Sequence, residues 1–208
     1  MKVAVIDYGI CNLGSVTRAL VEVGAEASVV LRPAQLASAD CIVLPGVGSF
    51  SDGMANLRVG GWTEAIREQV LDLGKPLLGI CLGMQLLATT GSEGGEIEGL
   101  DIIPGKVVRL DQMGCKLRIP HVGWNTIALT RNSEQVFSGI PIGTDFYFVH
   151  SYAFCPTYSE HVLAWTEYGI SIAAAVGSGH IVGTQFHPEK SSKAGFRVLA
   201  NFLRVKAC

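Results

Sequence analysis

The chain has 208 residues, of which 49% are hydrophobic and 16% charged, and its formal net charge is −2. Because this length suits one sizeable core and no Ser-rich, Pro-rich or charged linker divides the chain, we expect a single domain over residues 1–208. A chain so close to neutral has no basic face with which to recruit nucleic acid or an anionic membrane, so we exclude both as partners.

Cysteine usage and the N-terminus indicate a cytoplasmic protein with reduced thiols. The N-terminus enters an apolar segment at once, without the sections of a signal peptide, and no run of about 18 apolar residues would span a membrane. No C-x-x-C pair indicates a zinc site or a redox centre. The six cysteines are spread along the chain: Cys11, Cys41, Cys81, Cys115, Cys155 and Cys208.

The first half of the chain alternates between apolar, strand-like segments and segments with a helical pattern. Strands alternating with helices form parallel βαβ units, so we expect an α/β fold with a mostly parallel central sheet that is flanked by helices on both faces. Ligands of such sheets bind at the carboxyl ends of the strands. The predicted strands are 2–7, 27–31, 40–46 and 75–80, and the predicted helices are 12–24, 62–73 and 84–89.

The second half is richer in strands and ends in a helix. We expect its strands to extend the parallel sheet as antiparallel additions. The predicted strands are 105–110, 126–130, 144–154, 161–169, 170–176 and 180–186, and the final helix is 195–205.

The segment GICLGMQLL places Cys81 on the turn between a predicted strand and a predicted helix. A buried cysteine is the simpler interpretation, since free cysteine behaves as a small apolar residue. A sharp strand-to-helix turn, however, needs small neighbours, and Gly79 and Gly83 supply them, as in the elbow that presents a nucleophile above a sheet. At the start of a helix, unpaired amides also stabilise a thiolate. The position suits a nucleophile.

A nucleophilic thiol needs a base, and the base needs a group to orient it. In QFHPEKS, residues 185–191, an extended backbone would point His187 and Glu189 to the same face, and Pro188 would stiffen the pair. A carboxylate beside the imidazole holds its tautomer. The alternative is a surface His–Glu pair in a loop. The other four histidines lack a carboxylate at this spacing or lie at predicted strand edges: His121, His150, His161 and His180.

Two further features bear on substrate binding at such a site. The segment PGVG, residues 45–48, follows the third predicted strand and is either an ordinary turn or a backbone that meets developing negative charge, together with the amide of Leu82. Gln85 lies one helical turn after Cys81 and would face the same substrate, although an exposed polar residue is the commoner case.

GICLGMQLL, QFHPEKS and PGVG together resemble the class I (triad) glutamine amidotransferases. Five segments, in this order and over nearly the full length, further resemble the glutaminase subunits of imidazole glycerol phosphate synthases. G-x-C-x-G and H-P-E alone mark only the wider class, whereas the combination is specific. The segments are DYGICNLGS (7–15), LPGVGSF (44–50), PHVGWN (120–125), FYFVHSY (146–152) and HPEKSS (187–192).

This resemblance implies hydrolysis of glutamine to glutamate and ammonia, with Cys81 as nucleophile, His187 as acid and base, and Glu189 as the group that orients it. It implies an oxyanion hole made by Val47, Gly48 and Leu82. It also implies that glutamine is held by Gly48, Gln85, Ser151 and Tyr152. No metal ion or organic cofactor is expected.

The resemblance further implies a partner, a cyclase subunit with a (β/α)8 barrel, which uses the ammonia to make imidazole glycerol phosphate and AICAR in histidine biosynthesis. Lys190, Trp124 and His121 are the residues expected at this interface. The alternatives for the first two are a solvated lysine and a core tryptophan. In the isolated chain we expect an inactive orientation of PGVG, which docking of the barrel would change.

Three other functions compete with this interpretation. The glutaminase subunit of pyridoxal phosphate synthase belongs to the same class, but its oxyanion segment typically reads GGES rather than PGVG. A free-standing cysteine hydrolase would turn over without a partner. A non-enzymatic regulatory module would be expected to have lost a triad residue, yet Cys81, His187 and Glu189 are all present.

Overall fold

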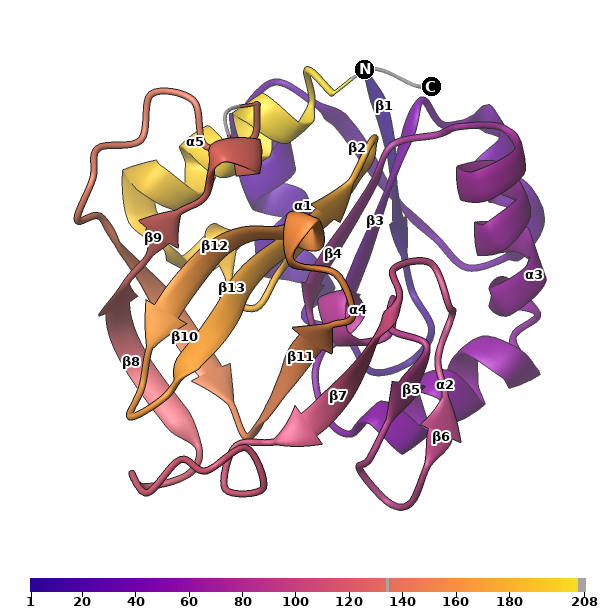
Figure 1. The fold of residues 1–208 in the computed structure, drawn as a ribbon. Coiled ribbons are helices and arrows are strands. Elements are labelled where there is room, and N and C mark those ends of the chain that lie inside the picture. The colour runs from indigo at the N-terminus through magenta and orange to yellow at the C-terminus, as the bar shows by residue number, and fades with distance from the viewer. Residues whose placement is uncertain (134, 206–208) are drawn as a thin grey trace.

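An eight-stranded mixed sheet forms the centre of the protein, seen here in a computed structural model that describes residues 1–133 and 135–205 (Figure 1). Its strands are β1 (Lys2–Ile6), β2 (Glu26–Val30), β3 (Cys41–Gly46), β4 (Leu77–Cys81), β9 (Ala128–Leu129), β12 (Val162–Glu167), β13 (Ser171–Ser178) and β14 (Ile181–Thr184). The order across the sheet is β2–β1–β3–β4–β14–β13–β12–β9. The strands from β2 to β14 are parallel, and β13, β12 and β9 continue the sheet antiparallel.

Helices cover both faces of the parallel strands, because successive apolar residues of a strand point to opposite faces and so make both faces apolar. On β1, Val3 and Val5 pack with the helices α1 (Leu13–Glu22) and α5 (Ser192–Phe202). Ala4 and Ile6 point to the opposite face and pack with α2 (Phe50–Val59) and α3 (Trp62–Arg67). Figure 1 shows these two pairs of helices on the two sides of the sheet. The predicted α/β fold with a mostly parallel sheet is confirmed.

Two smaller sheets complete the second half of the chain. The strands β8 (His121–Thr126) and β10 (Asp145–His150) form an antiparallel pair. The other sheet has the order β11–β7–β5–β6, with β5 (Thr90–Gly91), β6 (Ile97–Glu98), β7 (Gly105–Arg109) and β11 (Tyr152–Pro156). β11 packs against α4 (Leu82–Gln85), which directly follows β4 (Figure 1). The smaller sheets therefore lie beside the carboxyl end of β4, where Cys81 is found.

The predicted elements differ from the structure in several places, and the strands β5, β6 and β8 were not predicted. The helix expected at 84–89 is only the single turn α4, because the backbone oxygens of Leu86, Leu87 and Ala88 accept hydrogen bonds from residues 100–103 instead of continuing a helix. α2 was not expected, since Gly53 interrupts its pattern. Part of the second-half strand pattern forms the two smaller sheets rather than extending the central one. Within the described residues, no helix is long and apolar enough to cross a membrane.

Candidate active site

Cys81 lies on a sharp turn between β4 and α4. Its φ is +54° and its ψ −109°, a backbone conformation that non-glycine residues rarely adopt. The two flanking glycines permit this turn: a Cβ atom on Gly83 would lie 1.8 Å from the carbonyl oxygen of Leu44, and one on Gly79 would lie 2.7 Å from that of Gly83. The predicted elbow around Cys81 is therefore present, and its glycines are needed for close packing as well as for the turn.

His187 and Glu189 form a buried pair beside this turn. Nδ1 of His187 lies 2.8 Å from Oε1 of Glu189, and the two side chains are 3% and 1% exposed. The backbone between them does not have the predicted extended form, because Pro188 begins a short 3-10 helix, η5 (Pro188–Lys190). The two side chains nevertheless meet across this single turn. The alternative of a surface pair in a loop is wrong.

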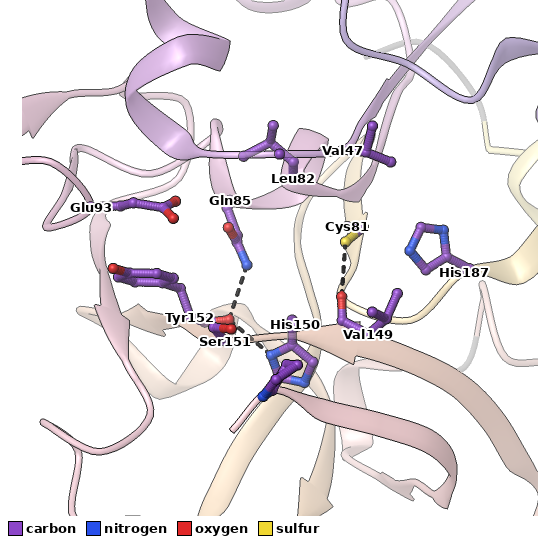
Figure 2. A pocket seen from close by; sticks show the side chains of 12 residues that line it. Val47, Cys81, Leu82, Gln85, Glu93, Val149, His150, Ser151, Tyr152 and His187 are labelled. Carbon is purple, nitrogen blue, oxygen red and sulfur yellow. Dashed lines mark hydrogen bonds between the residues drawn. The ribbon is translucent and has the colours of Figure 1, made fainter. Parts of the chain in front are cut away.

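The electrostatic surroundings of His187 favour its charged form. Burial alone would lower the pKa of His187, but the interactions with Cys81 and Glu189 outweigh burial and raise this pKa to about 9. Nε2 of the ring has no hydrogen-bond partner of good geometry among the described residues, and Figure 2 shows the ring beside Cys81. A resting site often has such a loose contact, which tightens when substrate binds.

A cavity of about 350 Å³ opens above Cys81 (Figure 2). Its wall contains eight of the predicted site residues, from four separate segments of the chain. Four further residues were not predicted. The lining consists of Val47, Gly48, Cys81, Leu82, Gln85, Ser151, Tyr152 and His187, together with Glu93, Pro120, Val149 and His150.

The segment that was expected to supply the oxyanion hole has its Val47 amide turned to another partner. The N–H of Val47 donates a hydrogen bond to the carbonyl oxygen of Ile10, at 3.0 Å. Gly48 follows with a φ of +99°, which glycine adopts without strain. Leu82 is the first residue of α4, so its N–H has no acceptor within the helix.

Gln85 is buried, with only 5% of its surface exposed, and is not a solvated helix residue. Its Nε2 donates to the carbonyl oxygen of Tyr152, at 3.0 Å, and to Oε1 of Gln185, at 2.8 Å. Nε2 of Gln185 in turn lies 3.7 Å from the Cys81 sulfur. Gln185 was not singled out from the sequence, although it stands two residues before His187 in the same motif.

Glu93 is the carboxylate on the cavity wall, and sequence reasoning missed it as well. Its Oε2 accepts a hydrogen bond from the amide of Phe50, at 2.7 Å, at the first residue of α2. It lies in a loop with no regular pattern, so only its place opposite Gln85 in the fold marks it (Figure 2).

The residues expected at a partner interface lie in different surroundings. Trp124 is 55% exposed and packs edge-on against Tyr147. Nζ of Lys190 is exposed and lies 5.9 Å from the centre of the Tyr147 ring. His121, in contrast, is only 3% exposed, so a partner could not contact it and its predicted place at the interface is wrong. Its Nδ1 lies 2.9 Å from Nε2 of His150.

Among the described residues, the other cysteines do not line the cavity. Cys11 and Cys115 are free thiols that contact the carbonyl oxygens of Pro45 and Tyr168. Cys208 lies outside the described residues. Within residues 1–133 and 135–205, no group of three His, Cys, Asp or Glu side chains could hold a metal ion.

Comparison with known proteins decides which family this site belongs to. The family model described as "Glutamine amidotransferase class-I" matches residues 4–205. The chain belongs to this family. Among curated proteins, it is 50% identical to imidazole glycerol phosphate synthase subunit HisH of Moorella thermoacetica, over 96% of this chain and 93% of that protein. It is 44% identical to the HisH subunit of Archaeoglobus fulgidus, over 98% of each chain.

Two solved structures share the fold of this chain. A glutamine amidotransferase superimposes with a TM-score of 0.76 at 20% identity, covering 97% of this chain and 97% of the other. PurLQS from Thermotoga maritima gives a TM-score of 0.74 at 20% identity, covering 98% and 97%. At such low identity these structures show the fold alone.

Proposed function

We propose that the chain is the glutaminase subunit of an imidazole glycerol phosphate synthase and that it hydrolyses glutamine through Cys81, His187 and Glu189. The observation that carries this proposal is the position of Cys81, on its strained turn, beside the buried His187–Glu189 pair and at the floor of one cavity. The high identity to HisH subunits over nearly the whole chain supports the same activity.

The proposed reaction has two halves. The thiolate of Cys81 attacks the side-chain amide carbon of glutamine, and the resulting tetrahedral intermediate collapses to a thioester when His187 gives a proton to the departing ammonia. Water then attacks the thioester and transfers a proton to His187, and glutamate leaves with Cys81 restored. Glu189 holds the Nδ1–H of His187, so that Nε2 faces the sulfur throughout.

The cavity wall supplies groups for glutamine itself. Nε2 of Gln85 is occupied by two protein acceptors, which leaves Oε1 to accept a hydrogen bond from the substrate. Glu93 attracts the α-ammonium group, since it is the carboxylate in the wall. Gly48, Ser151 and Tyr152 complete the binding surface. The mechanism uses only side chains and backbone of this chain.

A partner is part of the proposal. The relatives are named as subunits of imidazole glycerol phosphate synthase, so the ammonia passes to a (β/α)8 barrel, the cyclase subunit, in the cytoplasm. Because the Val47 amide is bound to Ile10, an oxyanion on Cys81 would meet the Leu82 amide but not that of Val47. Docking of the cyclase would favour the orientation that frees the Val47 amide. Lys190 and Trp124 are the proposed contacts.

The test measures product formation by the complex of this chain with its cyclase subunit. The natural complex should make imidazole glycerol phosphate from glutamine. With Cys81→Ala in the chain, glutamine should no longer support synthesis, whereas added ammonium salts still should, because only the supply of ammonia is lost. Glutamine-dependent synthesis by the alanine variant would refute the role of Cys81, and failure of the ammonium salts to restore synthesis would assign Cys81 a structural role.

A further inference from the structure

A series of hydrogen bonds runs from the β8–β10 pair to the glutamine cavity, and its members stand outside the triad. His121 and His150 are paired directly across these two strands. Nδ1 of His121 lies 2.9 Å from Nε2 of His150. Nδ1 of His150 lies 2.8 Å from the carbonyl oxygen of Tyr152, a contact drawn in Figure 2. At the outer end, Nδ2 of Asn125 lies 3.3 Å from Nε2 of His121. We call these four residues the histidine relay.

The direction of each hydrogen bond follows from the carbonyl oxygen at the inner end. An oxygen of this kind only accepts, so Nδ1 of His150 carries the proton. Burial lowers the pKa of His150 to about 3 and that of His121 to about 4, so both rings are neutral and each has one proton. Nε2 of His150 is then an acceptor, and Nδ1 of His121 must donate to it. Nε2 of His121 accepts from the Asn125 amide.

The ring of His121 is held firmly in this orientation. It stacks between Phe148, with ring centres 4.9 Å apart, and Tyr168, with ring centres 4.0 Å apart. Asn125 is also anchored, because its Nδ2 donates to the carbonyl oxygen of Glu167, at 2.9 Å. The outer half of the histidine relay is therefore fixed by packing and by the backbone.

The inner end of the relay meets Gln85. The carbonyl oxygen of Tyr152 accepts from both His150 and Nε2 of Gln85, and the same Nε2 donates to Gln185, which approaches the Cys81 sulfur. Because both acceptors lie beside Nε2 of Gln85, they fix the orientation of its side-chain amide and turn Oε1 toward the cavity. In the part of the chain that the structure describes, Oε1 of Gln85 has no hydrogen-bond partner.

We propose that His121 and His150 are positioning residues for glutamine: they hold the Tyr152 carbonyl in place, and this carbonyl orients Gln85 so that Oε1 is presented to the substrate. This inference rests on the proposed glutaminase activity. Neither histidine touches the reacting atoms. Loss of the relay should therefore weaken glutamine binding, seen in KM, much more than it slows the chemical step, seen in kcat.

Two substitutions at His150 separate positioning from packing. An asparagine amide places its nitrogen near the position of Nδ1, whereas a glutamine amide reaches the position of Nε2. His150→Gln removes the donor to Tyr152 and should raise the KM for glutamine at least tenfold in the complex with the cyclase, with kcat within threefold. His150→Asn keeps this donor and should restore KM to within threefold of the natural value. His161→Gln, a histidine in η4 (Ser159–His161) away from the cavity, is the matched control.

The outcomes of this experiment are distinct. If the natural complex has no glutaminase activity, the proposed function is wrong. If the natural complex is active and His150→Gln keeps its KM within twofold, or if His150→Asn loses as much as His150→Gln, the positioning role is refuted. Synthesis from ammonium salts, which bypasses the glutamine site, should be unchanged in every variant and shows that the complex is assembled.

A spectroscopic measurement on the natural chain tests the relay without any substitution. Nitrogen-15 NMR of the imidazole rings distinguishes the two neutral tautomers and the charged form. At pH 7.5, His121 and His150 should both be neutral with the proton on Nδ1, because each Nε2 is an acceptor. A proton on Nε2 of either ring, or a charged ring, would overturn the direction of the relay and with it the proposal.

Discussion

The amide of Val47 donates its hydrogen bond to the carbonyl oxygen of Ile10, 3.0 Å away, and not toward Cys81. This contact joins two loops that lie far apart in the sequence, and it opposes the amide orientation that an oxyanion hole requires. The peptide that would have to rotate joins Gly46 to Val47, so the torsion on its N-terminal side belongs to a glycine, which tolerates conformations that other residues do not. The resting chain thus has an identifiable bond that must break before Val47 can serve in the reaction.

The first prediction concerns this bond. The isolated chain should hydrolyse glutamine slowly, and the cyclase with a bound ligand should stimulate it. Val47→Pro removes the N–H and should lower the stimulated rate about 100-fold, since loss of one oxyanion donor costs ~10²–10³ in kcat. Synthesis from ammonium salts is the control for folding. A stimulated rate equal to that of the natural chain would show that this amide does not meet the oxyanion.

The second prediction concerns pH. The pKa of His187 is raised to about 9, so the imidazolium that protonates the departing ammonia persists up to that pH and is lost above it. The kcat/KM for glutamine should therefore fall as pH rises through about 9. Glu189→Gln removes one interaction that raises this pKa, so the fall should move to lower pH. Measuring kcat/KM from pH 6 to 10 for the natural complex and for the Glu189→Gln complex tests this. The prediction is contradicted if the activity of the variant falls at the same pH as that of the natural complex or at a higher pH.

The third prediction concerns the elbow. A Cβ on Gly83 would lie 1.8 Å from a backbone oxygen, which cannot move aside like a flexible side chain. Gly83→Ala should therefore lower the free energy of unfolding by about 3 kcal/mol. Gly14→Ala is the matched control in α1, because nothing lies within 4 Å of its Cβ, and it should raise this free energy by about 0.4–1 kcal/mol. Urea unfolding of the three chains measures both effects, and equal midpoints would refute the steric account.

The fourth prediction concerns the proposed interface. Trp124 is 55% exposed and rests on Tyr147 alone among aromatic rings of the described residues. Trp124→Ala should raise the Kd for the cyclase about 30-fold, which is about 2 kcal/mol, while the Tm of the chain changes little. Ile142→Ala, at a side chain that is 98% exposed, should leave the Kd unchanged. Calorimetric titration measures the Kd of each variant for the cyclase. Equal Kd values for the two variants would show that Trp124 is not part of the interface.

The sequence allowed prediction of the features that depend on local spacing. Cys81 stands out in the sequence because glycines flank it at a predicted strand-to-helix turn. His187 and Glu189 stand out because an imidazole and a carboxylate lie only two residues apart, so these three candidates could be named before the fold was known. The four parallel strands β1 to β4 of the central sheet were likewise predicted to within a few residues, because buried parallel strands are continuous apolar runs bounded by glycine or proline.

Features that depend on distant contacts could not be predicted in this way. α4 ends at Gln85, and the carbonyl oxygens of the next three residues, 86–88, accept hydrogen bonds from the backbone of residues 100–103 instead of continuing the helix. Nothing in the sequence of residues 82–89 indicates these contacts. His121 and His150 meet through the register of β8 and β10, which neither histidine determines. His121 was accordingly expected at the surface but is buried.

The backbone of Cys81 has a lasting consequence for how this protein can change. A φ of +54° with a ψ of −109° costs a residue with a side chain ~1–3 kcal/mol, and the neighbouring close packing leaves the chain no way to relax there. Glycine at this position would relieve that cost and stabilise the fold, but under the proposed mechanism it would remove the nucleophile. If Cys81 acts as proposed, every active variant must therefore keep a residue that the local backbone disfavours, so stability and activity are opposed at this one position.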